Sequence, residues 1–199
     1  RGNIFFAIDG KHNDGHNFLQ QAEKKGASIA VVKRKSNKIK IPQIIVSDTH
    51  KALIELAKYY RSLFKGKIIG ITGSVGKTST KDTLYYILSK SKKTYCSRKS
   101  FNNDFGVPLE ILNMSNQTEI GIFELGMNHK NEIKKLSKIL KPEIAIILNV
   151  NHVHSENFSS LKEIAIAKSE IFTSVNCVET LIINRQIDNF LTIKSLAKN

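Results

Sequence analysis

Residues 67–80, with the sequence KIIGITGSVGKTST, limit the possible folds of this chain more than any other stretch. A β-branched run is followed by a glycine-rich loop that ends in Gly76, Lys77 and Thr78, where a helical pattern begins. A loop of this kind between a strand and a helix can bind a triphosphate through its backbone N–H groups and the lysine charge. The hydroxyl that follows the lysine can bind the accompanying Mg²⁺. The segment therefore predicts an ATP- or GTP-dependent activity.

The loop departs from the general phosphate-loop pattern at one position. That pattern has a glycine five residues before the glycine of the Gly-Lys pair, and this chain has Ile71 there. The alternative interpretation is an ordinary strand-to-helix turn with a chance lysine. We favour the phosphate loop because a predicted strand precedes it and a predicted helix follows it. The predicted nucleotide-binding residues of the loop are Gly73, Ser74, Val75, Gly76, Lys77, Thr78 and Ser79.

Composition and charge narrow the function classes. Apolar residues make up 41% of the 199 residues, which is enough for a core. No apolar run approaches the ~18 residues of a membrane span.

The net charge of +14 raises the alternative of a nucleic-acid-binding phosphate-loop module. The lysines are spread over most of the predicted helices, so we favour a solvated basic surface without a nucleic-acid partner. Cys96 and Cys177 lack metal-type spacing and indicate free cytosolic thiols.

The chain is predicted to contain two α/β domains, residues 1–64 and 65–199. In the first domain we expect strands at 4–8, 28–33 and 43–46, and helices at 16–25 and 49–64. In the second domain we expect strands at 67–72, 93–96, 119–125, 143–149 and 179–184, and helices at 78–89, 108–114, 131–140, 160–171 and 187–198. This alternation, with nearly continuous apolar strands, predicts a doubly wound, mostly parallel sheet.

Polar residues follow the predicted strands at the edge where doubly wound sheets bind ligands. The phosphate loop follows the first strand of the second domain. The polar residues at or after the ends of the next three strands are Asn102, Asn103, Glu124, Asn149, His152 and His154. Glu124 closes a largely apolar run and is well placed as a Mg²⁺ ligand, directly or through water. The alternative is a charge that merely emerges at the sheet edge, and we favour the ligand. Asn149 is a further candidate for nucleotide binding.

The histidines and Lys168 each have a functional and a structural interpretation. His152 and His154 share a side of an extended segment, but no soft zinc ligands accompany them, and imidazole is an unusual Mg²⁺ ligand. Lys168 follows small apolar residues on a predicted helix, where a partly buried lysine can lose its proton. From the residues alone, a surface lysine that extends into water is favoured.

Five motifs occur in the order in which they occur in the Mur ligases of peptidoglycan synthesis, and the chain resembles that family. They are TGSVGKT (72–78), NNDFGVP (102–108), ELGMN (124–128), NVNHVHSENF (149–158) and AKSEIF (167–172). The second and third motifs are most similar to the type that adds D-alanyl-D-alanine to UDP-N-acetylmuramoyl-tripeptide. The stretch at 2–7, together with Asp14, Gly15 and His16, resembles the family's UDP-sugar-binding domain. The resemblance weakens after residue 183.

The resemblance implies roles that the residues alone do not establish. It implies ATP and Mg²⁺, and a substrate carboxylate that is activated as an acyl phosphate before an amine displaces the phosphate. The implied catalytic residues are Lys77, Glu124, His154 and Lys168. The implied Mg²⁺ ligands are Thr78, Glu124, His154 and a carbamylated Lys168. The implied substrate-binding residues are Asn102, Asn103, Asp14, Gly15 and His16.

The resemblance also implies a longer protein. Mur ligases carry a C-terminal domain that completes the active site, so we expect a fragment that does not ligate by itself. We expect the parent enzyme to be a monomer in the bacterial cytoplasm. A Mur ligase for another incoming amino acid is the main alternative, because the C-terminal domain holds much of that selectivity.

Overall fold

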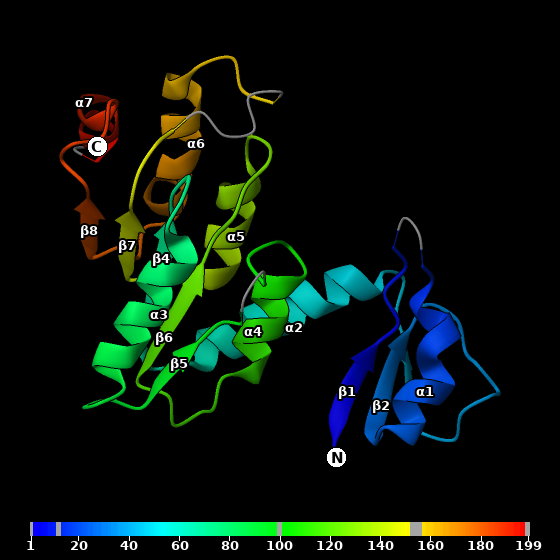
Figure 1. Cartoon of the computed structure of the whole chain (residues 1–199). Coiled ribbons are helices and arrows are strands. Elements are labelled where there is room, and N and C mark those ends of the chain that lie inside the picture. The colour runs from blue at the N-terminus through cyan, green and yellow to red at the C-terminus, as the bar shows by residue number, and fades with distance from the viewer. Residues whose placement is uncertain (1, 11–12, 99–100, 152–156, 198–199) are drawn as a thin grey trace. The chain divides into compact units, whose positions relative to one another are not determined.

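The computed structural model describes residues 2–10, 13–98, 101–151 and 157–197 (Figure 1). The chain forms two compact units, Arg1–Leu56 and Ala57–Asn199. Helix α2 (Thr49–Leu63) contributes residues to both units. The domain boundary after residue 64 stays a prediction. No helix in the described part of the chain has the length and apolar character needed to cross a membrane.

The first unit is built on a three-stranded parallel sheet. Its strands are β1 (Asn3–Phe6), β2 (Ala27–Val32) and β3 (Gln43–Ile45), in the order β1-β2-β3. The helix predicted at 16–25 begins as a 3-10 turn, η1 (Gly15–Phe18), and continues as α1 (Leu19–Lys24). The core consists of Ala7, Leu19, Ala30, Val32 and Ile39. The Thr49 hydroxyl donates to the Ala7 carbonyl at 3.0 Å and so joins the start of α2 to this core.

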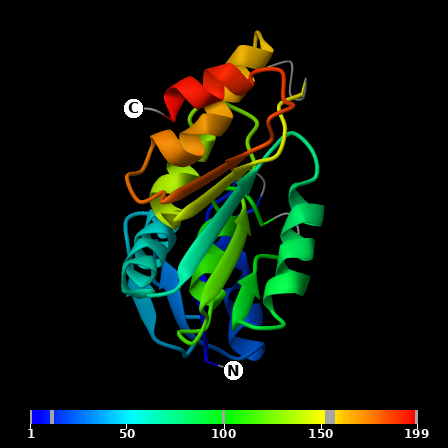
Figure 2. The same ribbon diagram turned by 90° about the vertical axis from the view of Figure 1, so that its left-hand side faces the viewer.

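The second unit is a doubly wound sheet, as predicted, and every strand pair in it is parallel. Its elements are β4 (Lys67–Thr72), α3 (Lys77–Leu88), β5 (Thr94–Cys96), α4 (Gly106–Asn113), β6 (Ile120–Glu124), α5 (Glu132–Leu140), β7 (Ile144–Ile147), α6 (Leu161–Thr173), β8 (Thr180–Ile183) and α7 (Phe190–Leu196). The strand order β5-β6-β4-β7-β8 puts β4 at the centre (Figure 2).

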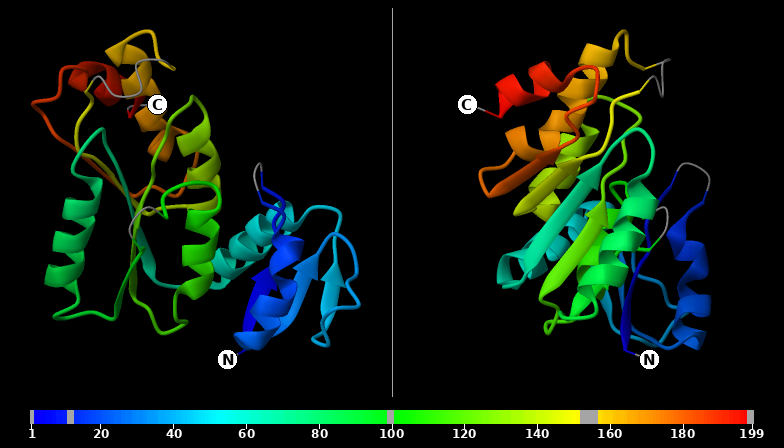
Figure 3. Two further views of the ribbon diagram at one scale, coloured as in Figure 1. Left: turned by 45° about the vertical axis from the view of Figure 1, so that its right-hand side comes forward. Right: turned by 60° about the vertical axis from the view of Figure 1, so that its left-hand side comes forward.

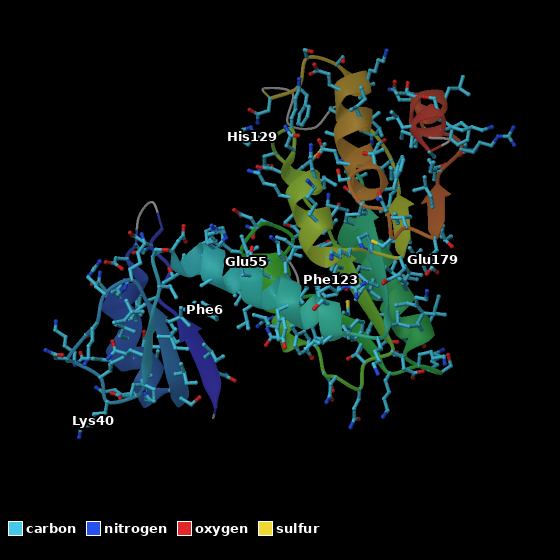
Figure 4. The ribbon with its side chains drawn as sticks, turned by 180° about the vertical axis from the view of Figure 1, so that it is seen from behind. Phe6, Lys40, Glu55, Phe123, His129 and Glu179 are labelled. Carbon is cyan, nitrogen blue, oxygen red and sulfur yellow. The ribbon has the colours of Figure 1, made fainter. Side chains whose placement is uncertain are left out.

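Helices cover both faces of this sheet (Figure 3). Leu84 and Leu88 of α3 pack on one face against a cluster that includes Ile69 and Ile71. Helices α4, α5 and α6 lie on the other face, and α7 packs on α6. Phe123 of β6 is fully buried inside this unit (Figure 4). The central strands read as continuous apolar runs because both of their faces are dry.

Arg61, near the end of α2, is a buried anchor for the second unit. Its Nε donates to the carbonyl of Leu140 at 2.6 Å, and its Nη2 donates to the carbonyl of Lys141 at 2.7 Å and to Glu143 Oε1 at 2.6 Å. The other oxygen of Glu143 accepts the N–H of Ile68 at 2.7 Å. The last carbonyls of a helix lack partners within it, so Arg61 caps α5 while Glu143 holds β4.

Replacing Arg61 with methionine is expected to destabilise the chain by about 3 kcal/mol, because Glu143 and the α5 carbonyls lose a buried partner. Urea unfolding followed by circular dichroism measures this loss. The control is Lys67→Met, which removes an exposed ion pair with Glu179 and should cost less than about 1 kcal/mol. Equal losses in the two variants would contradict the anchoring role of Arg61.

Candidate functional site

The loop between β4 and α3 turns at Gly76. Its φ of 82° lies in the left-handed region, which glycine adopts without steric cost. Helix α3 begins at the next residue, Lys77, and its first N–H groups have no partners within the helix. The Lys77 ammonium donates to the Gly73 carbonyl at 2.7 Å and so lies over the loop. The positive helix end and the lysine charge therefore occur together, which favours a bound phosphate.

Asn149, which follows β7, supports this loop from the neighbouring strand. Its Oδ1 accepts the N–H groups of Ser74 at 2.9 Å and Val75 at 3.0 Å, and its Nδ2 donates to the Val75 carbonyl at 3.0 Å. Two of the loop N–H groups through which the sequence predicts phosphate binding, those of Ser74 and Val75, are thus already bonded within the protein. Phosphate binding by the first N–H groups of α3 stays a prediction. Contact between Asn149 and a nucleotide stays a prediction.

Glu124 is a buried carboxylate at the end of β6, only 1% exposed. Its Oε2 accepts the Thr78 hydroxyl at 2.9 Å. Carboxylate and hydroxyl oxygens are hard ligands that suit Mg²⁺. Within the described ranges, no three His, Cys, Asp or Glu side chains form a metal-binding group. Among the described residues, Thr78 and Glu124 bring two such oxygen atoms together.

Lys77 lies near this carboxylate, and a second lysine, Lys168, lies near Lys77. Burial lowers the pKa of Lys77, and the charge of Glu124 partly offsets that effect. Lys168, on α6, is 2% exposed. Burial, with a smaller contribution from the charge of Lys77, lowers the pKa of Lys168 to about 7. The interpretation of Lys168 as a surface lysine is wrong, because α6 buries this side chain on the same side of the sheet as α4 and α5 and leaves much of it uncharged at neutral pH.

A cavity of about 390 Å³ opens beside Lys77. Its lining includes Asn102, Asn103, Asn128, Glu132 and Lys135. The predicted pair, Asn102 and Asn103, therefore shares a rim with the phosphate loop. Sequence reasoning missed Glu132 and Lys135, because their spacing on α5 is that of an ordinary solvated helix face.

Short backbone contacts fix the two asparagines of the cavity. The Asn102 carbonyl accepts the Gly126 N–H at 2.9 Å. A side chain at Gly126 would bring its Cβ within 3.0 Å of the Asn102 amide. Asn103 Oδ1 accepts the N–H groups of Phe105 at 3.2 Å and Gly106 at 2.8 Å and thereby caps α4. The side-chain oxygen of Asn103 is thus used within the fold.

In the first unit, Asp14, Gly15 and His16 form an ordered turn. Asp14 Oδ1 accepts the His16 N–H at 2.9 Å and contacts His16 Nδ1 at 2.7 Å, while Asp14 Oδ2 pairs with Arg34. These bonds, the His16 backbone N–H foremost, hold the pKa of the Asp14 carboxyl well below its usual range. His16 Nε2 accepts the Lys33 N–H at 3.0 Å, so Nδ1 carries the proton. Both ring nitrogens serve the fold, and substrate binding by this turn stays a prediction.

The predicted site residues converge in part. His152 and His154 lie outside the described residues. Lys77, Thr78, Glu124, Asn149 and Lys168 gather around the carboxyl ends of β4, β6 and β7. A central parallel strand that leads through a glycine turn into a helix, with a buried acid on the next strand, defines a phosphate-loop α/β domain.

The chain belongs to the Mur ligase family. Residues 71–199 match the family model described as the Mur ligase middle domain, and residues 1–61 match the one described as the Mur ligase family catalytic domain.

Curated relatives and solved structures place the chain within that family. The chain is 43% identical to the UDP-N-acetylmuramoyl-tripeptide–D-alanyl-D-alanine ligase of Rickettsia prowazekii. This match covers 100% of the chain and 44% of the Rickettsia protein. The crystal structure of MurF from Acinetobacter baumannii has a TM-score of 0.88 and 38% identity, with 98% of this chain and 43% of that chain covered. The structure of MurF ligase from Thermotoga maritima in complex with ADP has a TM-score of 0.85 and 31% identity, with 100% of this chain and 46% of that chain covered. The chain spans less than half the length of these relatives.

Replacing Asn149 with alanine is expected to speed amide exchange at Val75 by about tenfold, because this N–H loses its acceptor. The effect at Ser74 should be smaller, because its N–H also donates to the Asn149 backbone carbonyl at 3.3 Å, which the variant keeps. Hydrogen exchange detected by NMR measures this change. The matched control is Asn151→Ala, since Asn151 contacts Ser74 only through backbone atoms. Unchanged exchange in Asn149→Ala would show that its side chain does not hold the loop.

Proposed function

We propose that this chain forms the nucleotide-binding part of an ATP-dependent ligase that joins D-alanyl-D-alanine to UDP-N-acetylmuramoyl-tripeptide. The observation that carries the proposal is the contact between Thr78 and the buried Glu124 at the start of α3, beside Lys77. It combines a phosphate loop with an acid at a strand end, as ATP with Mg²⁺ requires. The name of the Rickettsia relative supports the substrates, and the Thermotoga complex with ADP supports the nucleotide.

The proposed reaction has two steps. A carboxylate oxygen of the tripeptide attacks the γ-phosphorus of ATP, ADP leaves, and an acyl phosphate forms. The dipeptide amine then attacks the acyl carbon, phosphate leaves as the amide forms, and the amine releases a proton. Lys77 and the first N–H groups of α3 would stabilise the negative charge on the transferring phosphoryl group.

The site fits a bound Mg²⁺, to which Thr78 and Glu124 would supply oxygen ligands. When bound, Mg²⁺ neutralises charge on phosphate oxygens. The cavity beside Lys77 is the proposed place of the tripeptide carboxylate, because Asn102 and Lys135 line it with hydrogen-bond donors close to the phosphate loop.

Replacing Lys77 with methionine is expected to weaken ATP binding by about tenfold or more, since a charged hydrogen-bond donor to phosphate is lost. Isothermal titration of the 199-residue chain with ATP and Mg²⁺ measures the affinity. Lys135→Met is the control: it removes a lysine from the cavity but none from the loop, and should leave ATP affinity within about twofold. Equal affinities of wild type and Lys77→Met would sink the phosphate-loop assignment.

Ligation itself is tested in a chimaera. Residues 1–199 replace the matching segment of the Rickettsia relative, and ADP release is measured with UDP-N-acetylmuramoyl-tripeptide. The proposal expects release that depends on D-alanyl-D-alanine and is lost with Lys77→Met. Release that depends on a single amino acid instead would favour a different Mur ligase activity.

We further propose that Lys168 is carbamylated, as the family resemblance implies. Its neutral amine would add CO₂ and release a proton, which gives a negatively charged, carboxylate-like metal ligand. Its burial and its pKa of about 7 support this, because only the uncharged amine reacts with CO₂.

Carbamylation of Lys168 is expected to give a ¹³C signal when the chain is equilibrated with ¹³CO₂. At a fixed concentration of dissolved CO₂ the signal should grow as the pH rises through about 7, because the amine loses its proton in that range. Lys168→Met should abolish the signal, whereas Lys130→Met, which removes a half-exposed lysine, should keep it. A signal of equal strength in Lys168→Met would refute the modification.

We also propose a cytoplasmic location and a monomeric state for the enzyme. The location is supported by the free thiols of Cys96 and Cys177, which suit a reducing compartment.

A further inference from the structure

Two buried charged residues lie outside the site described above. Lys81 of α3 is 1% exposed and Glu110 of α4 is fully buried. Both contact the connection between β5 and α4, which also carries Asn102 and Asn103. Burying a charge is unfavourable unless partners compensate, so the contacts of these two groups indicate what they do.

Lys81 joins the helix of the phosphate loop to this connection. Its Nζ donates to the carbonyl of Ser97, the first residue after β5. Its nearest carboxylate is the half-exposed Asp82, 3.7 Å away. Lys81 lies four residues after Lys77, one turn further along the same helix. The start of α3 and the Ser97 carbonyl are therefore connected through one continuous helix.

Glu110 holds the same connection from the other side. Its Oε2 accepts the Arg98 N–H at 2.7 Å and the Tyr95 hydroxyl at 2.9 Å, and its Oε1 accepts Arg98 Nε at 2.7 Å. The Arg98 guanidinium lies 4.5 Å from the centre of the Phe101 ring, and the Phe101 N–H donates to the Arg98 carbonyl at 3.3 Å. Asn102 follows Phe101 in the chain, so Glu110 supports its position through Arg98 and Phe101, by hydrogen bonds that do not involve α3.

We propose that Lys81 is a positioning residue that couples the phosphate loop to Asn102 and Asn103 at the cavity. The coupling rests on the proposed function, because ATP is the ligand proposed to bind at the start of α3. A methionine would fill the space of Lys81 without burying a charge. What the ammonium adds is a charged hydrogen bond to the Ser97 carbonyl, which transmits the helix position to the cavity wall.

Two glycine amides report the positions of the asparagines. The Gly126 N–H donates to the Asn102 carbonyl at 2.9 Å, and the Gly106 N–H donates to Asn103 Oδ1 at 2.8 Å. Their exchange is measured by NMR on the 199-residue chain, with and without ATP and Mg²⁺. The proteins compared are wild type, Lys81→Met and Glu110→Gln.

Without ATP, both variants are expected to speed exchange at Gly126 and Gly106 by about tenfold. ATP is expected to slow this exchange in wild type and in Glu110→Gln. In Lys81→Met, ATP should bind within about twofold of the wild-type affinity, yet the slowing should be absent, because the link to α3 is lost. A purely structural role of Lys81 would not separate these two measurements.

The outcomes distinguish the inference from the proposed function. If wild type does not bind ATP, the proposed function fails and the coupling fails with it. If ATP binds and slows exchange equally in wild type and Lys81→Met, the coupling alone is overturned. Unchanged exchange in Lys81→Met without ATP also overturns it. If Lys81→Met does not fold, Lys81→Leu, which also has no hydrogen-bond donor, replaces it under the same expectations.

Discussion

The parallel pairing of β4 with β6 and β7 is the constraint on which the site depends. Ile71 lies opposite Glu124, and Thr72 lies opposite Ile147. Because these strands run in the same direction and end together, the phosphate loop, Glu124 and Asn149 meet at one edge. A shift of one residue in β6 would turn Glu124 to the opposite face of the sheet, away from Thr78. The chemistry of the loop thus depends on strand register as much as on its own residues.

Burial changes the protonation of the charged side chains at this edge of the sheet. The charge of Glu124 acts on Lys77, the charge of Lys77 acts on Lys168, and α6 removes Lys168 from water. Desolvation and the neighbouring charge of Lys77 together favour the neutral amine of Lys168. The same residues that would bind a nucleotide therefore also create a neutral amine, which is the chemical requirement for the carbamate proposed at Lys168.

The secondary structure and the class of fold could be predicted because their signals are local. The apolar run before the loop, Gly76 at the turn and the helical spacing after Lys77 all lie within a few residues of one another. The contacts that arrange the site join distant parts of the chain. Asn149 binds Ser74, and Arg61 caps a helix that ends at Leu140. No local periodicity marks such pairs, and so the capture of loop N–H groups by Asn149 was not foreseen.

The sequence by itself determined the alternation of strands and helices, the phosphate loop and the order of the motifs, because propensity, glycine turns and apolar periodicity act over short distances. Only the tertiary structure decided which polar side chains are buried and what they face. Lys81, Lys135 and Lys168 all lie on helices, yet one is tied to a carbonyl, one lines a cavity and one has a pKa near neutrality. Their residue type is the same, and the difference arises from the desolvation and neighbouring charges that packing imposes.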